Sequence, residues 1–447
     1  MNILSSQKFR FTLGCAVLLL VSLASSDVYT QSKTKQLAQQ DNSFTQQENF
    51  APLESQISFT SNQIPDQLTS GFQNPLIPQQ TSAEITGKEN AFSSQQDLLA
   101  ASAPYPIIDE FKKYKFSING NQVVTPVKLP SSKVNFNQGD LLTVLVNTRK
   151  YFQDYSSQDP DILRTGILTT QGVTVQDVLK TLDFMIAVLK EDIANKRATR
   201  LQDPKFINSN FRVIKWTAYN PKNKKQKQLR ITKYAVFTHP GSRKKTSTFN
   251  TPIYSLKDSS NNNTFYTKYT KQDVLSGIYE PGGKEFGKVK SLAYLTRTGL
   301  EEALMQGTIL INFTDGYRAF FNVDRNNGMS YIRGLKATAQ KRYWYFREVD
   351  AIKGYGYKID AKISIKPGVT FAGDVLNIGL GKVIIIEHTK GGRKHLQMGV
   401  MADTGGAFLP NLYQLDFLAG IFKSQKEFRQ NIGQLPEYAT AYFLVKK

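Results

Sequence analysis

Hydrophobic residues first gather in one short run near the start of this chain. The run extends from Cys15 to Ala24, follows the basic residues Lys8 and Arg10, and precedes several small residues. It is too short to cross a bilayer comfortably, and a basic start with a small-residue end is typical of a secretory signal. We therefore predict that residues 1–26 are a signal peptide. The mature protein is then exported to the periplasm or cell wall without stable membrane insertion.

Residues 27–103 have no regular hydrophobic pattern. They are rich in Gln, Ser, Asn and Thr, and their few apolar residues show no sustained period. Such a segment cannot bury enough apolar surface to offset the entropy of an ordered chain. It is predicted to be a disordered tether.

Helical and strand patterns follow one another in the remaining chain. Apolar residues recur at helical spacing in 141–155 and again in 175–195, which predicts two amphipathic helices. After residue 211 the pattern becomes that of short strands, at 229–237, 307–313, 317–323, 342–347, 382–387 and 440–445. Strands at such intervals favour a sandwich or barrel over alternating strands and helices. Asp315-Gly316 lies between two of them and predicts a tight hairpin turn.

Composition limits the classes of function. The 447 residues are 40% hydrophobic, which is enough for one large or two moderate cores. The net charge is +21, and the excess lies in 104–447 because the tether is acidic, so a negatively charged partner is plausible. Nucleic acid is not the predicted partner, because the chain lacks an arginine-rich helix and an RNA-binding aromatic motif. Cys15, the only cysteine, lies in the predicted signal, which excludes disulfides and cysteine zinc sites from the mature chain.

Common catalytic motifs are absent from the sequence. It has no phosphate-binding loop, dinucleotide fingerprint, nucleophile elbow or HExxH motif. His239, His388 and His395 are scattered, so we predict no metal and no cofactor. Ser242-Arg-Lys-Lys245 has the SxxK spacing of penicillin-binding enzymes but lacks their other motifs, and a basic surface turn explains it better.

Three aspartates stand beside apolar strands and glycines. Asp374 precedes the apolar run 383–386, Asp403 follows another such run, and Asp416 comes thirteen residues after Asp403. A carboxyl beside a buried strand end can have a raised pKa suited to general acid catalysis. From spacing alone, the capping of a turn by each aspartate is the simpler interpretation.

The residues around these aspartates resemble a known family. Asp403-Thr-Gly-Gly-Ala407 and Asp416-Phe-Leu-Ala-Gly420 resemble the DTGGAIKG…D-x-F-x-G signature of the membrane-bound lytic murein transglycosylase A (MltA) family, which has a C-terminal three-aspartate domain. The segment 374–381 resembles the D-x-x-x-I-P-L-G segment of that domain, with Gly379 in place of proline. Further similar segments follow in family order at 231–234, 246–254, 306–308, 315–316, 327–331 and 343–348. The resemblance covers roughly 140–446.

The resemblance implies a mainly β fold and an exported peptidoglycan enzyme. Family members have a double-psi β-barrel, built from segments on both sides of an inserted second β-domain, and bind a glycan strand in the groove between them. On this basis 104–240 would hold a short helical part and the first barrel segment, 241–335 the inserted domain, and 336–447 the three-aspartate barrel domain. The family cleaves the β-1,4 bond between N-acetylmuramic acid and N-acetylglucosamine without water, forms 1,6-anhydro ends and needs no cofactor.

The motif also implies site residues. Asp416 would be the acid and then the base, with Asp403 and Asp374 beside it. The residues expected to bind the glycan are Thr232, Tyr234, Gln306, Asn327 and Tyr331. Alternating aromatic side chains at Tyr343, Trp344 and Phe346 could stack on sugar rings, although packing in a core is their more common role.

Two departures from the family motif leave an alternative open. Phe408-Leu-Pro410 replaces the IKG segment and its lysine, and the interval from Asp403 to Asp416 is longer than in the family. The alternative is a catalytically inactive peptidoglycan-binding or cell-wall structural protein. Glycan strands are the predicted partner in both cases, with other cell-wall proteins as further candidates.

Overall fold

The computed structural model describes residues 104–109, 115–257, 264–332, 334–405, 408, 410–433 and 435–447. The predicted signal peptide and tether lie outside these residues. In the described ranges the α-helices are α4 (Gln138–Tyr155), α5 (Val175–Ala194), α6 (Pro204–Asn210), α7 (Lys271–Leu275), α8 (Arg297–Ala303) and α9 (Gln425–Ile432). The first eight strands are β1 (Pro104–Pro106), β2 (Ser117–Asn119), β3 (Val124–Val127), β4 (Val134–Asn135), β5 (Phe211–Trp216), β6 (Leu229–Gly241), β7 (Thr251–Leu256) and β8 (Val289–Leu295). The later strands are β9 (Thr308–Phe313), β10 (Arg318–Asn326), β11 (Trp344–Val349), β12 (Thr370–Ala372), β13 (Val383–Lys390), β14 (Arg393–Asp403), β15 (Gln414–Phe422) and β16 (Tyr438–Lys446).

Six strands close into a barrel. They pair in the order β6, β15, β12, β14, β13 and β16, and β16 pairs again with β6. The pairs β6–β15 and β12–β14 are parallel, and the other four are antiparallel. Closing the ring gives every barrel strand a partner on both sides. The predicted mainly β fold is confirmed, whereas the double-psi connectivity of this barrel stays a prediction.

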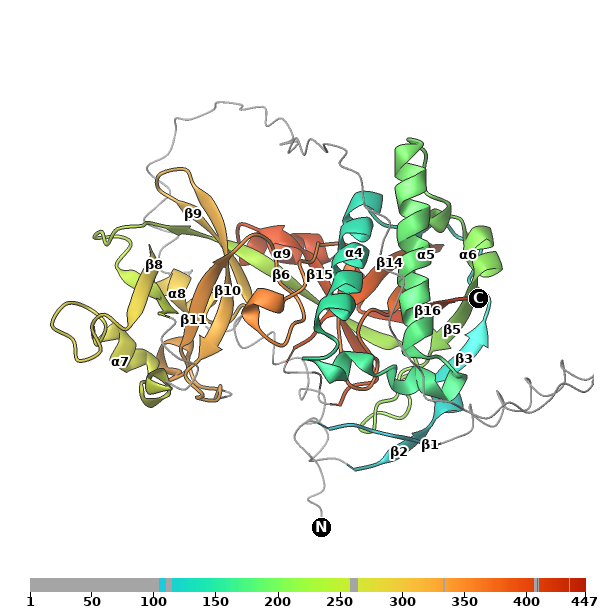
Figure 1. Cartoon of the computed structure of the whole chain (residues 1–447), viewed down its shortest axis with the longest axis horizontal. Helices are drawn as coiled ribbons and strands as arrows, with labels where there is room; N and C mark the ends of the chain where they lie inside the picture. Colours follow the sequence, from blue (N-terminus) through green and yellow to red (C-terminus); the bar gives the residue numbers. More distant parts are fainter. Residues whose placement is uncertain are drawn as a thin grey trace, which may run out of the picture. The chain divides into compact units, whose positions relative to one another are not determined.

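Two helices cover the barrel, and both lie where the periodicity predicted amphipathic helices. Asn137 caps α4 by accepting a hydrogen bond from the backbone N–H of Asp140 at 2.9 Å. Thr174 and Asp177 form a reciprocal capping box at the start of α5. The two helices pack against each other, and their apolar faces pack on β14 and β16 (Figure 1). Both predicted helices are confirmed to within a few residues.

Strand β6 belongs to two sheets. Eight of its positions, from Arg230 to Phe237, pair with β15 in the barrel, and its last four, from Thr238 to Gly241, pair with β9 in a second sheet. That sheet continues through β10 to β11, so β6 joins the two sheets through continuous backbone (Figure 1). The predicted hairpin between β9 and β10 is confirmed, with Gly316 at a φ of 85°.

A second hydrophobic core lies apart from the barrel core. It is formed by β7–β11 with α7 and α8, and includes fully buried Ile253, Leu295 and Ile311. It also contains Tyr343, Tyr345 and Phe346, because β11 pairs with β10 in the second sheet. The second core therefore extends beyond residue 335, where the sequence placed its boundary.

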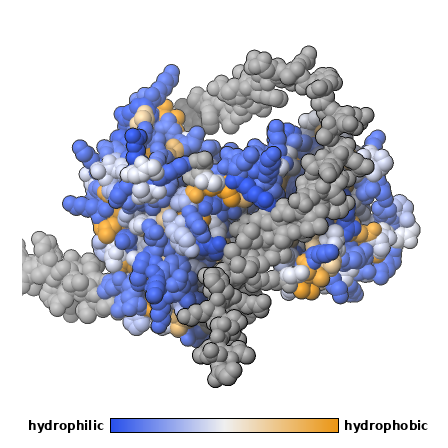
Figure 2. All heavy atoms as spheres, turned by 180° about the vertical axis from the view of Figure 1, so that it is seen from behind, coloured by the Kyte–Doolittle hydropathy of each residue, from blue (hydrophilic) through white to orange (hydrophobic). Residues whose placement is uncertain are grey.

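The molecular surface is mainly polar on the face seen in Figure 2, with small scattered apolar groups. Phe286 and Ile332 are the most exposed large apolar residues of the described chain, at 61% and 52%. No helix within the described ranges has the length and apolar character needed to span a membrane.

Candidate active site

Asp403 and Asp416 lie on either side of one small residue. Ala372 of β12 pairs with Asp416 of β15 on one side and with Asp403 of β14 on the other. Adjacent strands are separated by about 4.8 Å, so the two aspartate Cα atoms are roughly 9.5 Å apart. The residue between them is buried and has only a methyl side chain.

The carboxyl of Asp416 has one oxygen without a hydrogen-bond partner. Its Oδ1 is buried and receives no hydrogen bond from any described residue. Burial raises the pKa of Asp416, against the opposing effects of Thr232, Arg230 and Lys233 on β6. An unpaired buried oxygen and a raised pKa both favour the protonated acid.

Thr232 fixes the backbone around Asp416. The two residues are register partners in the parallel pair β6–β15. Thr232 Oγ1 donates to the carbonyl oxygen of Leu415 at 3.1 Å and accepts from Gln414 Nε2 at 3.0 Å. This predicted sugar-binding residue thus holds the strand that carries Asp416.

The carboxylate of Asp403 is better satisfied. Tyr234 Oη donates to Oδ2 at 2.7 Å, and the backbone N–H of Thr404 donates to Oδ1 at 2.8 Å. Burial raises the pKa of Asp403 to about 6, while these two hydrogen bonds and the charge of Lys362 favour its ionised form. Burial thus raises the pKa of both carboxyls, and Asp403 is the one whose hydrogen bonds favour the ionised form. Two carboxyls with such different surroundings can take acid and base roles.

Asp374, predicted to lie beside Asp416, is a buried structural acceptor. Its Oδ1 accepts from the backbone N–H groups of Leu376 and Asn377, at 3.2 and 3.0 Å. Its Oδ2 accepts from Asn377 Nδ2 at 2.7 Å and from the backbone N–H of Asn411 at 2.8 Å. With 2% exposure, Asp374 ties the turn after β12 to the segment leading into β15.

Gln306 links the two sheets near the middle of β6. Its Oε1 accepts from the backbone N–H of Phe237 at 2.9 Å, and its Nε2 lies 3.2 Å from Nε2 of His239. Burial lowers the pKa of His239 to about 4, so its ring is neutral at pH 7 and can accept this hydrogen bond. Gln306 therefore fixes the end of α8 to the strand shared by the two sheets.

Asn327 has no polar atom left for a ligand. It is 1% exposed, and its Nδ2 donates to the carbonyl oxygens of Tyr269 and Lys341 at 2.8 and 3.0 Å. Its Oδ1 accepts from the backbone N–H groups of Met329 and Tyr343, at 3.4 and 3.0 Å. The structure thus places this predicted sugar-binding residue in the second core, where it joins three segments.

Tyr331 belongs to a surface group of aromatic side chains around a cation. The guanidinium carbon of Arg342 lies 5.3 Å from the Tyr331 ring centroid and 4.3 Å from that of Trp344. Both rings are partly exposed and remain available for stacking. Tyr343 and Phe346 are fully buried, so core packing is their role and they do not reach a ligand.

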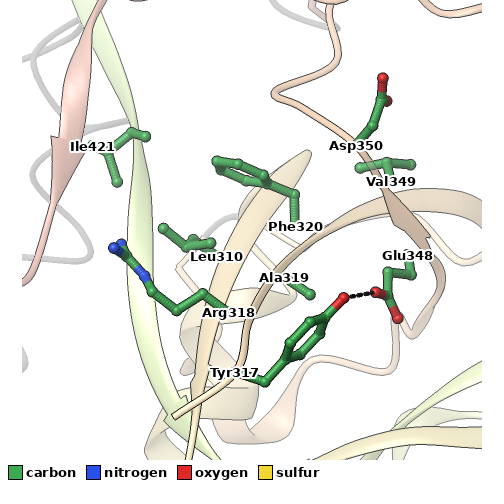
Figure 3. Close-up of a pocket in the computed structure, with 9 residues that line it drawn as sticks. All are labelled: Leu310, Tyr317, Arg318, Ala319, Phe320, Glu348, Val349, Asp350 and Ile421. Carbon is green, nitrogen blue, oxygen red and sulfur yellow. Dashed lines mark hydrogen bonds between the residues drawn. The ribbon is translucent and has the colours of Figure 1, made fainter. Parts of the chain in front are cut away.

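An open cavity of about 740 Å³ lies where β15 approaches the second sheet. Its lining residues, shown in Figure 3, are Leu310, Tyr317, Arg318, Ala319, Phe320, Glu348, Val349, Asp350 and Ile421. Tyr317 Oη donates to Glu348 Oε1 at 2.9 Å across its rim, and the Arg318 side chain points away from that pair (Figure 3). Sequence reasoning missed this cavity, because its walls come from strands separated by about a hundred residues.

No set of three or more His, Cys, Asp or Glu side chains converges as metal ligands within the residues that the structure describes. His388 and His395 stack as a cross-strand pair with ring centroids 5.4 Å apart, and His239 lies in the other sheet.

Comparison with solved structures finds several lytic transglycosylases. MltA of Escherichia coli with bound chitohexaose is 16% identical, with a TM-score of 0.49 over 75% of this chain and 97% of that chain. A membrane-bound lytic murein transglycosylase of Agrobacterium tumefaciens is 17% identical, with a TM-score of 0.49 over 72% and 98%. MltA of Neisseria gonorrhoeae is 14% identical, with a TM-score of 0.48 over 77% and 97%. No protein-family profile matches the sequence, and no curated protein matches it.

Proposed function

We propose that this chain is an exported lytic transglycosylase of peptidoglycan. It would cleave the β-1,4 bond between N-acetylmuramic acid and N-acetylglucosamine and form 1,6-anhydromuramic acid ends. The observation that carries the proposal is the carboxyl pair across Ala372, in which Asp416 keeps a buried oxygen without a hydrogen-bond partner among the described residues and Asp403 accepts two hydrogen bonds. These two residues also stand at the motif positions to which the family resemblance assigns the chemistry.

In the proposed reaction one carboxyl acts twice. Asp416 donates its proton to the glycosidic oxygen while the bond from that oxygen to C1 of N-acetylmuramic acid breaks. The C6 hydroxyl oxygen of the same sugar then bonds to C1, and the hydroxyl proton passes to the Asp416 carboxylate. One C–O bond breaks and one forms, no water is consumed, and the acid is restored.

Asp403 supports this cycle without contacting the bond that breaks. A fixed negative charge near Asp416 opposes loss of the Asp416 proton before substrate binds, and stabilises positive charge that develops on the sugar ring. Hydrolases with two carboxyls also activate water or form a covalent intermediate. Here the second carboxyl accepts hydrogen bonds from Tyr234 and Thr404, which leaves it poorly placed to act as a nucleophile.

The glycan is proposed to lie between the barrel and the second sheet. The cavity beside Ile421 opens there, and the partly exposed rings of Tyr331 and Trp344 offer stacking surfaces on the second sheet. Gln306 contacts Phe237 and His239 of β6, the strand shared by the two sheets. We leave Asn327 and Asp374 out of the substrate site because their polar atoms are committed to the fold.

The test is a digest of intact peptidoglycan with the purified protein, followed by mass spectrometry of the products. We expect 1,6-anhydro products from the unmodified protein and a loss of about 10²–10⁴-fold in their rate with Asp416→Asn. Asp183→Asn is the matched control, because it changes an exposed carboxylate on α5 that pairs with Arg149. That variant should retain the full rate.

The other outcomes discriminate between mechanisms. Anhydro products that persist in Asp416→Asn would keep the reaction and remove Asp416 as its acid. Reducing-end products that depend on Asp416 would show that water attacks, and the enzyme would be a hydrolase. Absence of cleavage together with retention on peptidoglycan would favour the catalytically inactive binding protein.

A further inference from the structure

The chain segment that follows Asp403 and includes Asp416 contains no basic residue. This segment extends from Thr404 to Phe422, so any positive charge beside Asp403 must come from another segment. Among the described residues, the cation that acts on Asp403 is Lys362, which lies in the segment between the two sheets, forty-one positions earlier.

Two glycines allow Lys362 to approach the end of β14. The backbone N–H of Ile363 donates to Tyr355 at 2.8 Å, and the N–H of Tyr355 donates to the carbonyl of Ala402 at 2.9 Å. A Cβ at Gly354 would lie 2.5 Å from the Ala402 carbonyl oxygen, and a Cβ at Gly356 would lie 2.6 Å from Cα of Lys362. Only glycine fits at these two positions, and the resulting close packing brings Lys362 next to the strand end that carries Asp403.

The ammonium group of Lys362 is anchored on the second sheet. Nζ donates to Asn322 Oδ1 at 2.6 Å and to the carbonyl of Val323 at 3.3 Å, both on β10. Asn322 is itself buried and donates to Thr308 Oγ1 at 2.7 Å. An ammonium group has three donors, and no described residue accepts from the third.

The charge of Lys362 is not neutralised by an ion pair. Among the residues that the structure describes, no carboxylate oxygen lies within 4.0 Å of Nζ. Two carboxylates act on it from greater distance, Asp324 and Asp403, and Asp324 already pairs with Arg347 at 3.0 Å. The Lys362 charge is therefore available mainly to Asp403.

We propose that Lys362 is a positioning residue of the carboxyl pair. From its anchor on β10 it places a positive charge beside Asp403 and so favours the ionised form of that carboxyl. This inference rests on the proposed function for its catalytic consequence. The electrostatic effect of Lys362 on the titration of Asp403 can be measured in the absence of substrate.

Other charged and titratable groups also face Asp403 and Asp416. Asp403 faces Tyr234 of β6 and Asp416 of β15, and the Tyr234 hydroxyl donates to it. Asp416 faces Arg230 and Lys233 of β6. Lys233 Nζ donates to the carbonyl of Pro436, and burial lowers the pKa of Lys233 as it does that of Lys362. Lys362 is therefore the cation whose removal affects Asp403 directly.

The first test is a carboxyl titration by NMR with ¹³C-labelled aspartate. The Asp403 signal is assigned by its loss in Asp403→Asn. We expect Lys362→Met to raise the midpoint of this titration by about one pH unit, and Lys362→Arg to restore it. Lys358→Met is the matched control, because this exposed lysine of the same segment lies over the Tyr357 ring, 5.2 Å from its centroid. In Lys358→Met, the midpoint of the Asp403 titration should stay at the value of the unmodified protein.

The second test is the pH dependence of kcat on peptidoglycan. In Lys362→Met, the midpoint of the acidic limb should move upward by about one pH unit, so that kcat falls about tenfold at a pH below the limb. In Lys362→Arg, the midpoint should return to the value of the unmodified protein. Thermal melting of each variant establishes that it folds.

The outcomes separate this inference from the proposed function. An unchanged Asp403 midpoint and an unchanged acidic limb in folded Lys362→Met would overturn the role of Lys362 and leave the transglycosylase standing. A shifted midpoint in a protein that releases no product would overturn the proposed function and leave the coupling of Lys362 to Asp403 in place.

Discussion

Tyr234 and Asp403 are joined by a 2.7 Å hydrogen bond that crosses two strands of the barrel. Tyr234 lies on β6 and Asp403 on β14, and β15 and β12 lie between them. Burial raises the pKa of Tyr234 well above its usual value, so the phenol remains a donor throughout the physiological range. The bond fixes the Asp403 carboxyl and favours its ionised form.

Tyr234→Phe should therefore disturb the carboxyl pair more than the fold. Without the phenol donor, the pKa of Asp403 should rise above about 6, and the acidic limb of kcat should move upward. A lost buried hydrogen bond to a charged group should also lower the free energy of unfolding by about 1.5–3 kcal/mol. The measurements are a pH–rate profile and urea unfolding.

Tyr343→Phe is the control for this prediction. Its hydroxyl donates to the carbonyl of Pro252 at 3.1 Å within the second core. The control should lower stability by about 1 kcal/mol and leave the pH–rate profile unchanged. Identical profiles for Tyr234→Phe and the unmodified enzyme would contradict the assigned role of Tyr234.

The raised pKa of Asp403 predicts that stability falls as pH rises. The folded protein holds this proton up to a pH of about 6, whereas the unfolded chain loses it near the ordinary value of 3.8. The contribution of this proton to the free energy of unfolding is thus fully present below pH 3.8. It is lost as pH rises through 6, by up to about 3 kcal/mol. Asp403→Asn cannot titrate there, so it should gain stability relative to the unmodified protein between pH 4 and 7.

Urea unfolding of both proteins at pH 4, 5, 6 and 7 measures this difference. Asp183→Asn, on the exposed face of α5, provides the reference for removal of a surface carboxylate. Parallel curves for Asp403→Asn and the unmodified protein would show that Asp403 titrates alike in the folded and unfolded states.

Asp374→Ala should be a folding defect. The substitution leaves the backbone N–H groups of Asn377 and Asn411 and the Asn377 amide without their acceptor. With several buried donors unpaired, we expect a loss of about 3–5 kcal/mol in the free energy of unfolding. Urea unfolding measures the loss, and Asp315→Ala, in an exposed turn, is the control. A stable Asp374→Ala protein that lacks activity would instead return Asp374 to the reaction.

Asn327→Ala should weaken the second core without a specific effect on glycan binding. Two carbonyls and two backbone N–H groups lose their partner, at an expected cost of about 2–4 kcal/mol. The neighbouring Asn326→Ala removes one exposed acceptor, for the N–H of Gly328, and should cost less than about 1 kcal/mol. Affinity for soluble glycan fragments, measured below the unfolding transition, should be equal in both variants. A selective loss of affinity in Asn327→Ala would restore it as a ligand contact.

Features that depend on near neighbours could be predicted from the amino-acid sequence. The two covering helices follow from apolar spacing in 141–155 and 175–195, and the hairpin follows from Asp315-Gly316, because both signals act within a few residues. The short strands indicated a mainly β fold for the same reason. Asp403 and Asp416 were already candidates, since their flanking residues carry the motif.

The surroundings of each candidate residue could not be predicted from the sequence, because they depend on the folded chain. Asp374, Asp403 and Asp416 look alike along the chain, yet one is a saturated buried acceptor, one is held ionised and one keeps an unpaired oxygen. Those differences come from partners that are distant in sequence, such as Tyr234, which is 169 positions from Asp403. The charge that Lys362 adds depends likewise on packing between segments. Local pattern sets secondary structure, whereas protonation depends on burial and on groups brought together by the closed barrel.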